Sequence, residues 1–352
     1  MIDCLEFKTY VNKRLSTFKI ATGSSDTAEN VIVKVKCGDE FGVGNANPTN
    51  VTQETLASVE GFLSMAKKKI IGTDECDLLK LHQRLDAIAP GNTAAKAGID
   101  IAVFDMISKR ENKPLYEFLG GSKDRILTDM TIGIESRDVT VKKATQHCKA
   151  GFRALKVKVG LDLNEDIKRV SAIREAVGPS IELRVDANQG YTVDQAIGFS
   201  EAMRSLDVVV IEQPVNAADL VGLKRVTEES EVPIMADECV KSSADARRIA
   251  REGIADMINI KLMKSAGIND AVMINRLAEA TDINTMIGCM GEIQVSIAAG
   301  LHFALSSKNV VYADLDSHFN ILEDPSSGLT FEDGCLIAPK KPGLGISTPL
   351  DE

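Results

Sequence analysis

The chain has 352 residues, of which 44% are hydrophobic and 26% are charged, and its formal net charge is −10 at pH 7. This length suits one large barrel or two ordinary domains, and no apolar run reaches the roughly 18 residues that a membrane helix needs. The negative charge, the absence of Trp and the few aromatic residues argue against nucleic-acid binding, which needs clustered Lys and Arg and stacking surfaces. We therefore expect a soluble protein with neither a nucleic-acid nor a membrane partner.

The cysteines and histidines indicate which cellular compartment the protein occupies and which kind of metal site it can contain. The seven cysteines are dispersed without a C-x-x-C motif, and the first 15 residues lack the basic and then apolar order of a secretion signal. This pattern predicts reduced thiols and a cytoplasmic protein. The four histidines are not paired at metal-binding intervals, so we expect carboxylates to hold any metal, which favours a hard ion such as Mg²⁺.

Residues 1–122 have the pattern of a small α+β unit. Two alternating apolar runs flank Gly-Asp-Glu within residues 30–46 and indicate a hairpin. Helical periodicity follows near residues 53–70, 74–85 and 93–110. Residues 16–28 and 45–53 are rich in Thr, Ser, Asn and Gly, and we interpret them as loops that act as lids and determine specificity.

From residue 123 to residue 320, short apolar runs alternate with helical stretches. Eight runs have the composition of strands: 128–134, 154–159, 181–187, 207–213, 232–237, 256–262, 283–288 and 309–316. Four intervening stretches show 3.6-residue periodicity: 164–178, 192–206, 242–253 and 267–282. Eight alternations predict a (β/α)₈ barrel, whereas a doubly wound open sheet is less favoured because no Gly-rich phosphate motif follows the first run. Residues 321–352 lack this rhythm and are expected to return to the N-terminal unit.

Charged residues recur at the ends of the predicted strands. Lys158, Asp186, Glu212, Asp237 and Lys261 follow one another at intervals of 28, 26, 25 and 24 residues, which is one charged residue per repeat. Because the carboxyl ends of barrel strands meet on one face, these side chains should converge. Three converging carboxylates repel one another unless a divalent cation lies between them. We therefore predict that the three acids bind one Mg²⁺, for which Mn²⁺ could substitute.

The two lysines of this set flank the acids in sequence, so they should face each other across the barrel. A nearby cation and burial lower the pKa of a lysine, which can then act as a base near neutral pH. Lys158 and Lys261 are predicted to move a proton at a carbon next to a metal-bound carboxylate, one on each face, inverting that carbon through an enediolate. Lys156, on the same strand face as Lys158, is predicted to polarise the carboxylate.

The last predicted strand ends in two acids, Asp314 and Asp316, within the sequence VVYADLDSH. The two-residue period of a strand puts both carboxylates on one face, where they repel each other unless they hold a cation. A second interpretation is that they cap a following helix.

Five short motifs together resemble those of the enolase superfamily, which uses a Lys or His base with Mg²⁺. They are KVK at 156–158, DAN at 186–188, EQP at 212–214, ADE at 236–238 and NIKLMK at 259–264. Their order and spacing look like the muconate-lactonizing-enzyme subgroup, and the resemblance covers nearly the whole chain. It implies an α+β capping domain at 1–122, a modified TIM barrel at 123–320 and a C-terminal segment at 321–352 that completes the cap.

Within this subgroup, ADLD at 313–316 resembles the mark of dipeptide epimerases, in which the two aspartates hold the free α-ammonium of the substrate. By the same resemblance, Thr131, Cys289 and Met290 should lie near the peptide. Asn188 and Glu238 should lie beside the metal ligands.

The resemblance also exposes one departure in the cap. Members that prefer L-Ala-D/L-Glu tend to place an arginine against the glutamate side chain, at the position where this chain has Gly23. Lys19 is the nearest basic residue and could replace it only in part, because lysine lacks the bidentate fork of arginine. We therefore expect small or varied second residues.

These residues and the resemblance predict a Mg²⁺-dependent dipeptide epimerase that inverts the C-terminal α-carbon of an Ala-containing dipeptide. L-Ala-D/L-Glu, from murein peptide recycling, is the first substrate to test, and a homo-oligomer is expected. An N-acylamino acid racemase and an o-succinylbenzoate synthase are alternatives that use the same machinery without an ammonium clamp. A catalytically silent binding protein is less favoured, because it has no need to keep buried like charges around a metal.

Overall fold

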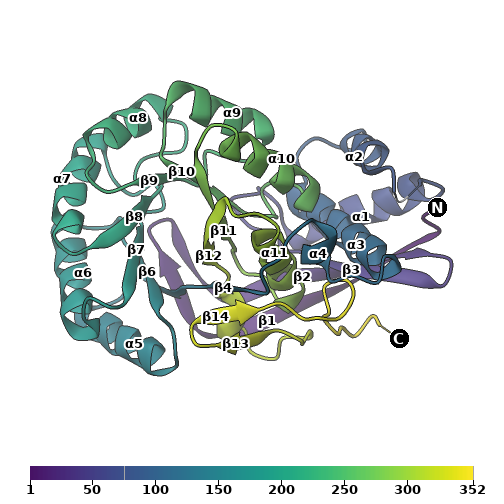
Figure 1. Ribbon diagram of the computed structural model, residues 1–352, viewed down its shortest axis with the longest axis horizontal. Helices are drawn as coiled ribbons and strands as arrows, with labels where there is room; N and C mark the ends of the chain where they lie inside the picture. The colour runs from purple at the N-terminus through teal and green to yellow at the C-terminus, as the bar shows by residue number, and fades with distance from the viewer. Residues whose placement is uncertain (75, 352) are drawn as a thin grey trace.

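The computed structural model describes residues 1–74 and 76–351. It contains a capping unit and a barrel, which lie side by side in Figure 1. The capping unit begins with an antiparallel sheet of β1 (Cys4–Ile20), β2 (Gly23–Cys37) and β3 (Glu40–Ala46). Its helices are α1 (Leu56–Ile70), α2 (Leu78–Asp86), α3 (Thr93–Arg110) and α4 (Leu115–Phe118). The predicted hairpin and the three predicted helices are therefore present.

Two glycines allow α3 to lie directly on β3. A Cβ atom at Gly42 would lie 1.9 Å from the carbonyl oxygen of Ala102, and one at Gly44 would lie 2.1 Å from that of Gly98. No larger residue fits at either position without moving the helix. The close packing buries α3 over almost its whole length, which gives the sheet a rigid support.

Eight parallel strands form the barrel. They are β5 (Met130–Ile132), β6 (Ala154–Lys158), β7 (Glu182–Asp186), β8 (Val208–Glu212), β9 (Ile234–Ala236), β10 (Met257–Ile260), β11 (Asn284–Gly288) and β12 (Val310–Asp314). Strands adjacent in sequence are adjacent in the sheet, and a parallel bridge between Thr128 and Ala313 joins its two edges. Each predicted run contains one of these strands, so the predicted (β/α)₈ class is confirmed.

A helix follows each strand from β5 to β11. These helices are α5 (Arg137–Lys149), α6 (Leu163–Val177), α7 (Val193–Arg204), α8 (Leu220–Glu229), α9 (Ser243–Glu252), α10 (Ile268–Glu279) and α11 (Gln294–Leu305). The sequence predicted α6, α7, α9 and α10 but not the other three. In α11, almost every residue is buried, so it lacks the polar face that makes a surface helix recognisable. Within the described residues, none of the helices combines the length and apolar character that a bilayer span requires.

The lid predicted at residues 16–28 is not a loop. It forms the tip of the β1–β2 hairpin, where Lys19 pairs with Ser24 and Ile20 pairs with Gly23. Polar side chains are compatible with strands that are partly exposed to solvent, which is why composition alone was misleading here. Figure 1 shows the hairpin extending from the capping unit to the barrel. There the carbonyl oxygen of Lys19 accepts a hydrogen bond from Ile134 N at 2.8 Å.

The C-terminal segment contacts both parts of the molecule. Its strands β13 (Thr330–Glu332) and β14 (Cys335–Ile337) form a small sheet with β4 (Arg125–Leu127). Before β13 and after β14 the segment contacts the capping unit. Leu322 N donates a hydrogen bond to Lys13 O at 2.8 Å, and Leu115 N donates one to Gly343 O at 2.9 Å. The bounds of the three predicted domains stay a prediction.

Candidate active site

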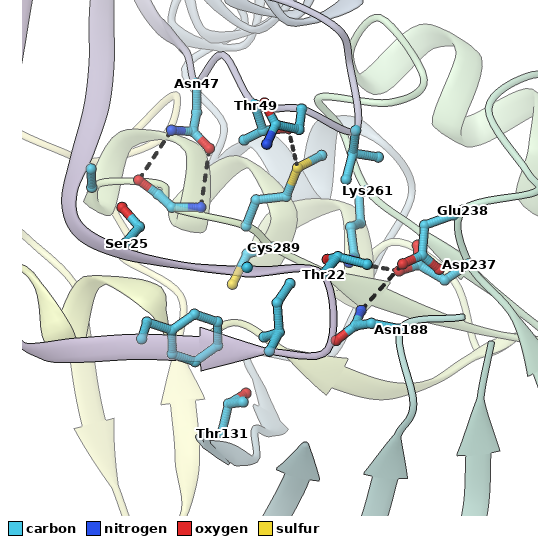
Figure 2. A pocket seen from close by; sticks show the side chains of 18 of the residues that line it. Thr22, Ser25, Asn47, Thr49, Thr131, Asn188, Asp237, Glu238, Lys261 and Cys289 are labelled. Atoms are coloured by element: carbon cyan, nitrogen blue, oxygen red, sulfur yellow. Dashed lines mark hydrogen bonds and ion pairs between the residues drawn. The ribbon is translucent and has the colours of Figure 1, made fainter. Parts of the chain in front are cut away.

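A cavity of about 630 Å³ lies between the hairpin tip and the carboxyl ends of the barrel strands. The capping unit contributes Arg14, Phe18, Ile20, Thr22, Gly23 and Asn47 to its wall. The barrel contributes Thr131, Lys158, Asn188, Asp237, Glu238, Lys261, Cys289, Met290, Asp314 and Asp316. Figure 2 shows side chains from both units around this space. Four residues of the predicted set are not on the wall: Lys19, Lys156, Asp186 and Glu212.

Lys156 is fully buried and joins three strands. Its Nζ is 3.1 Å from Asp186 Oδ2, 2.6 Å from Glu212 Oε2 and 2.8 Å from Asp314 Oδ2. The register brings these groups together, because Asp186 on β7 lies opposite Lys158 on β6 and Glu212 on β8. Lys156 therefore neutralises buried carboxylates, and its predicted role in polarising the substrate carboxylate stays a prediction.

Two other lysines reach the cavity from opposite sides of the barrel. Lys158 ends β6, and its Nζ is 2.6 Å from Asp186 Oδ2. Lys261 directly follows β10, and its Nζ is 2.9 Å from Asp237 Oδ2, a contact drawn in Figure 2. Strands β6 and β10 are four positions apart in the eight-stranded sheet, so the two ammonium groups face each other across the cavity.

Asp237 holds two ammonium groups. Its Oδ2 contacts Lys261, and its Oδ1 is 2.5 Å from Lys264 Nζ. Burial raises the pKa of Asp237, but the two lysines lower it by a larger amount. The net pKa is therefore well below its usual range. For Lys261, burial lowers the pKa while Asp237 and Glu212 raise it, and the net direction is upward. The lowering predicted from the sequence is not found, because carboxylates are the charges closest to this lysine.

Two glutamates next to these groups lie where the negative charge of neighbouring acids is only partly compensated. Burial, together with Asp186 and Asp237, raises the pKa of Glu212 to about 8 and that of Glu238 to about 7. Asn188 Nδ2 donates to Glu238 Oε1 at 3.2 Å, as Figure 2 shows. Within the described residues, Glu238 Oε2 and Asn188 Oδ1 are buried without a hydrogen-bond partner. Buried oxygen acceptors with surplus negative charge are suited to a hard divalent cation, so this donor set fits Mg²⁺.

Asp314 and Asp316 form a second acidic group, with Cys289. Among the residues that the structure describes, these three are the one set of potential metal ligands whose atoms all lie within 4.8 Å of one another. The three predicted metal ligands do not form such a group, and each contacts a lysine ammonium group instead. Asp316 accepts a hydrogen bond from Thr131 N at 2.6 Å, and the thiol of Cys289 is 3.6 Å from its other oxygen. Burial and the charge of Asp314 raise the pKa of Asp316 to about 6, so the pair attracts a cation.

The helix-cap interpretation of the aspartates does not hold. Asp316 precedes the 3₁₀-helix η1 (Ser317–Asn320), but its side chain makes no capping hydrogen bond. Asp314 lies within β12 and is paired with Lys156. Both carboxylates instead line the cavity.

The charged residue that the capping unit contributes to the cavity wall is not the one that the sequence predicted. Gly23 lines the cavity, and a Cβ atom there would have nothing within 4 Å. Lys19 is exposed and does not line the cavity, so it does not replace the missing arginine. Arg14 does line the cavity, and the sequence reasoning missed it. The two-residue period of β1 gives no signal for it, because the pairing register of this strand shifts between Lys13 and Phe18.

The capping unit also holds the loop after β11. Asn47 Oδ1 accepts a hydrogen bond from Gly291 N at 3.0 Å, and Asn47 Nδ2 donates to Gly291 O at 3.2 Å. Thr49 Oγ1 is 3.0 Å from Met290 Sδ. Figure 2 shows these contacts above Cys289. Cap and barrel residues therefore build one continuous wall, which sequence reasoning did not predict.

Both parts of the chain match known families. Residues 5–120 match the mandelate racemase / muconate lactonizing enzyme N-terminal domain, and residues 139–351 match the enolase C-terminal domain-like family. A hydrophobic dipeptide epimerase from Enterococcus faecalis is 40% identical over 340 residues, covering 95% of this chain and 96% of that protein. An L-Ala-D/L-Glu epimerase from Bacillus subtilis is 37% identical and covers 94% of this chain and 92% of that protein.

Two solved structures also match this chain over almost its whole length. The dipeptide epimerase from E. faecalis, complexed with Mg and the dipeptide L-Leu-L-Tyr, is 39% identical with a TM-score of 0.96, covering 98% of this chain and 99% of that one. The N-succinyl Arg/Lys racemase from Bacillus cereus is 31% identical with a TM-score of 0.95, covering 99% of this chain and 96% of that one. The chain therefore belongs to the mandelate racemase / muconate lactonizing enzyme family of the enolase superfamily, is an isomerase, and resembles the dipeptide epimerases of that family.

Proposed function

We propose that this protein is a Mg²⁺-dependent dipeptide epimerase that inverts the α-carbon of the C-terminal residue. One observation carries the proposal: Lys158 and Lys261, from opposite sides of the barrel, line a single cavity whose wall also holds the Asp314–Asp316 pair. The names of the E. faecalis and B. subtilis relatives, which match over almost the whole chain, support the reaction. The Mg and dipeptide in the E. faecalis structure support the cofactor and the substrate class.

Asp186, Glu212 and Asp237 would hold the metal, with Asn188 and Glu238 next to them. The fit rests on the partly compensated charge and the unpartnered buried oxygens at this point of the barrel. When bound, the ion would supply positive charge that binds the substrate carboxylate and offsets the negative charge developing there as the α-proton leaves. Mn²⁺ also accepts carboxylate ligands, and we expect it to substitute.

The chain's own residues account for proton transfer and orientation. One lysine takes the α-proton from one face of the carbon, and the other delivers a proton to the opposite face, which inverts the configuration. Asp314 and Asp316 bind the α-ammonium of the first residue in charge-assisted hydrogen bonds and so fix the direction of the peptide. Burial raises the pKa of Asp314, but Lys156, Lys158 and Lys261 lower it, and the net effect keeps Asp314 ionised for this role.

Proton NMR of dipeptides in D₂O with Mg²⁺ tests the proposal directly. The α-proton signal of the C-terminal residue should disappear and the second diastereomer should appear, and EDTA should stop both changes. The library should contain L-Ala-L-Glu, L-Ala-L-Ala and larger second residues, because Gly23 leaves the cap wall open at the hairpin tip. The same peptides with an amidated C-terminus serve as controls, since they lack the carboxylate. Absence of exchange in every peptide, with Mg²⁺ bound, would contradict the proposal.

A second candidate is an N-acylamino acid racemase. Arg14, a cation on the cavity wall, favours it, since an acyl group with a carboxylate could pair with it. Asp316→Asn separates the two candidates. We expect this variant to lower kcat/KM for dipeptides by about 10- to 100-fold, because a hydrogen bond to a charged group contributes about 1.5–3 kcal/mol. Unchanged turnover of dipeptides would mean that no ammonium is held there, and N-acylamino acids would become the substrates to test.

A further inference from the structure

Arg14 is a cation on the cavity wall that the proposed reaction does not use. It lies on β1, where a bridge to Ile321 holds its backbone. Its guanidinium carbon is 5.5 Å from the centre of the Phe18 ring. A Cβ atom placed on Gly291 would lie 2.9 Å from Arg14 Nη2, so the guanidinium group reaches from the capping unit to the loop after β11.

The guanidinium group has more donors than partners. Its Nε donates to Thr27 O at 3.3 Å. Within residues 1–74 and 76–351, Nη1 and Nη2 make no hydrogen bond, and the group forms no ion pair. Burial lowers the pKa of Arg14, while Cys289 and Asp316 raise it; arginine nevertheless stays charged at any working pH. A partly buried guanidinium whose two Nη groups are both free is suited to binding an anion in bidentate fashion.

Arg14 also stands between two cavities. A side cavity of about 220 Å³ shares with the main cavity the residues Arg14, Phe18, Thr131, Met290 and Asp316. Its remaining wall includes Lys143, Gln146, His147 and Phe319. Lys143 is already paired with Glu135 at 2.5 Å. Arg14 is therefore the lysine or arginine on this wall that keeps no carboxylate partner among the described residues.

We propose that Arg14 binds a carboxylate carried by the amino-terminal half of the substrate, in the side cavity beside Asp316. This inference rests on the proposed function, in which Asp314 and Asp316 hold the amino end of a dipeptide. Because Asp316 lies on the wall of both cavities, a group attached to that end can enter the side cavity and meet the guanidinium. The carboxylate has two sources, an acidic side chain on the first residue or an N-succinyl group.

The test compares substrates that differ only in this charge. Affinity and kcat/KM for α-proton exchange are measured with Mg²⁺ for L-Glu-L-Ala, L-Gln-L-Ala, L-Ala-L-Ala and N-succinyl-L-Ala. Affinity is measured by calorimetry, which needs no turnover. Arg14→Met removes the charge and keeps most of the side-chain length. Lys13→Met is the matched control, because Lys13 is the exposed neighbour of Arg14 on the same strand.

We expect the wild-type protein to prefer L-Glu-L-Ala over L-Gln-L-Ala by about tenfold or more, since charge-assisted bidentate pairs are the strong hydrogen bonds. Arg14→Met should remove this preference through KM and leave L-Gln-L-Ala and L-Ala-L-Ala within about twofold, and Lys13→Met should change nothing. Gly291→Ala, which places a methyl group against the guanidinium, should weaken L-Glu-L-Ala selectively. A greater preference for N-succinyl-L-Ala would assign the carboxylate to the acyl group.

Two results would overturn this role of Arg14. One is equal affinity of the wild-type protein for the charged and neutral substrates. The other is an equal loss for both in Arg14→Met, which would mean that the residue only supports the fold. Charge-selective binding by Arg14 without α-proton exchange in any dipeptide would retain this role and overturn the proposed function instead.

Discussion

Buried charges lie at two levels inside the barrel, and only one of these levels borders a cavity. At the lower level, fully buried Arg184 is 2.9 Å from Asp129 Oδ2 and 2.6 Å from Glu182 Oε1. The ring of Tyr312 lies against its guanidinium at 4.3 Å. None of these four residues lines either cavity.

The upper level lies two residues further along the same strand, where Asp186 follows Arg184 with the same orientation. Here several carboxylates and lysines contact one another, and Lys158, Lys261 and Asp237 line the cavity. The residue types are similar at the two levels, but their access to a ligand is not.

The comparison shows that burial and a shifted pKa do not by themselves mark a functional site. Burial and the charge of Asp314 raise the pKa of Asp129 at the closed lower level, just as burial and neighbouring acids raise those of Glu212 and Glu238 above it. What distinguishes the upper level is that its charged groups border a space that a substrate can enter.

The largest expected effect comes from removing the upper lysines. Lys158→Ala and Lys261→Ala should each lower epimerisation by about 10²–10⁴-fold, the usual contribution of a general base. Each variant should keep deuterium exchange for one configuration only, and the two variants should differ in which one, because each lysine serves one face of the carbon. NMR of pure diastereomers in D₂O measures this, with exposed Lys168→Ala as the control. Exchange of both diastereomers at the normal rate would contradict the two-base mechanism.

Removing Arg184, the cation of the lower level, should reduce stability rather than activity. Arg184→Met leaves the carboxylates of Asp129 and Glu182 without their partner and should lower the free energy of unfolding by about 3–5 kcal/mol. Urea denaturation measures this loss, and Arg184→Met combined with Asp129→Leu should recover most of it. A fall in kcat without a loss of stability would mean that the two levels do not have separate roles in catalysis and stability.

A buried histidine that belongs to neither level should make the free energy of unfolding depend on pH. His302 accepts a hydrogen bond from Tyr116 N at 3.0 Å through Nδ1, and burial lowers its pKa from 6.5 to about 4. The unfolded chain binds this proton first, so stability is complete above pH 6.5 and falls by about 3 kcal/mol as the pH drops to 4. His302→Gln should flatten the curve of unfolding free energy against pH in this window. An unchanged slope would mean that His302 is already protonated in the folded state.

The smallest effect concerns metal binding at the upper level. A ligand that binds only the folded state at 100 times its Kd adds about 2.7 kcal/mol of stability, so Mg²⁺ should raise the Tm. Asp237→Asn should abolish this rise, whereas Asp129→Asn, at the lower level, should preserve it. A rise of equal size in both variants would place the ion elsewhere.

Much of the barrel was predictable because its signals are local. The short apolar runs marked each strand, and parallel strands must end on one face, so the regular spacing of Lys158, Asp186, Glu212, Asp237 and Lys261 was enough to predict that they meet. Helix α11 escaped prediction because it is buried on almost all sides, and the hairpin tip escaped because its polar composition is also typical of loops.

The sequence by itself determined the strand positions and the charged residue at the end of each, since both depend on patterns within a few residues. Only the tertiary structure decided which of these charges reach the cavity. Lys156 and Lys158 are two residues apart, yet one is enclosed by three carboxylates and the other lines the cavity. Arg14 reaches the cavity because the β1–β2 hairpin packs across the barrel beside Gly291, almost 280 residues further along the chain. Contacts over such separations depend on how the two units pack together, which no local pattern encodes.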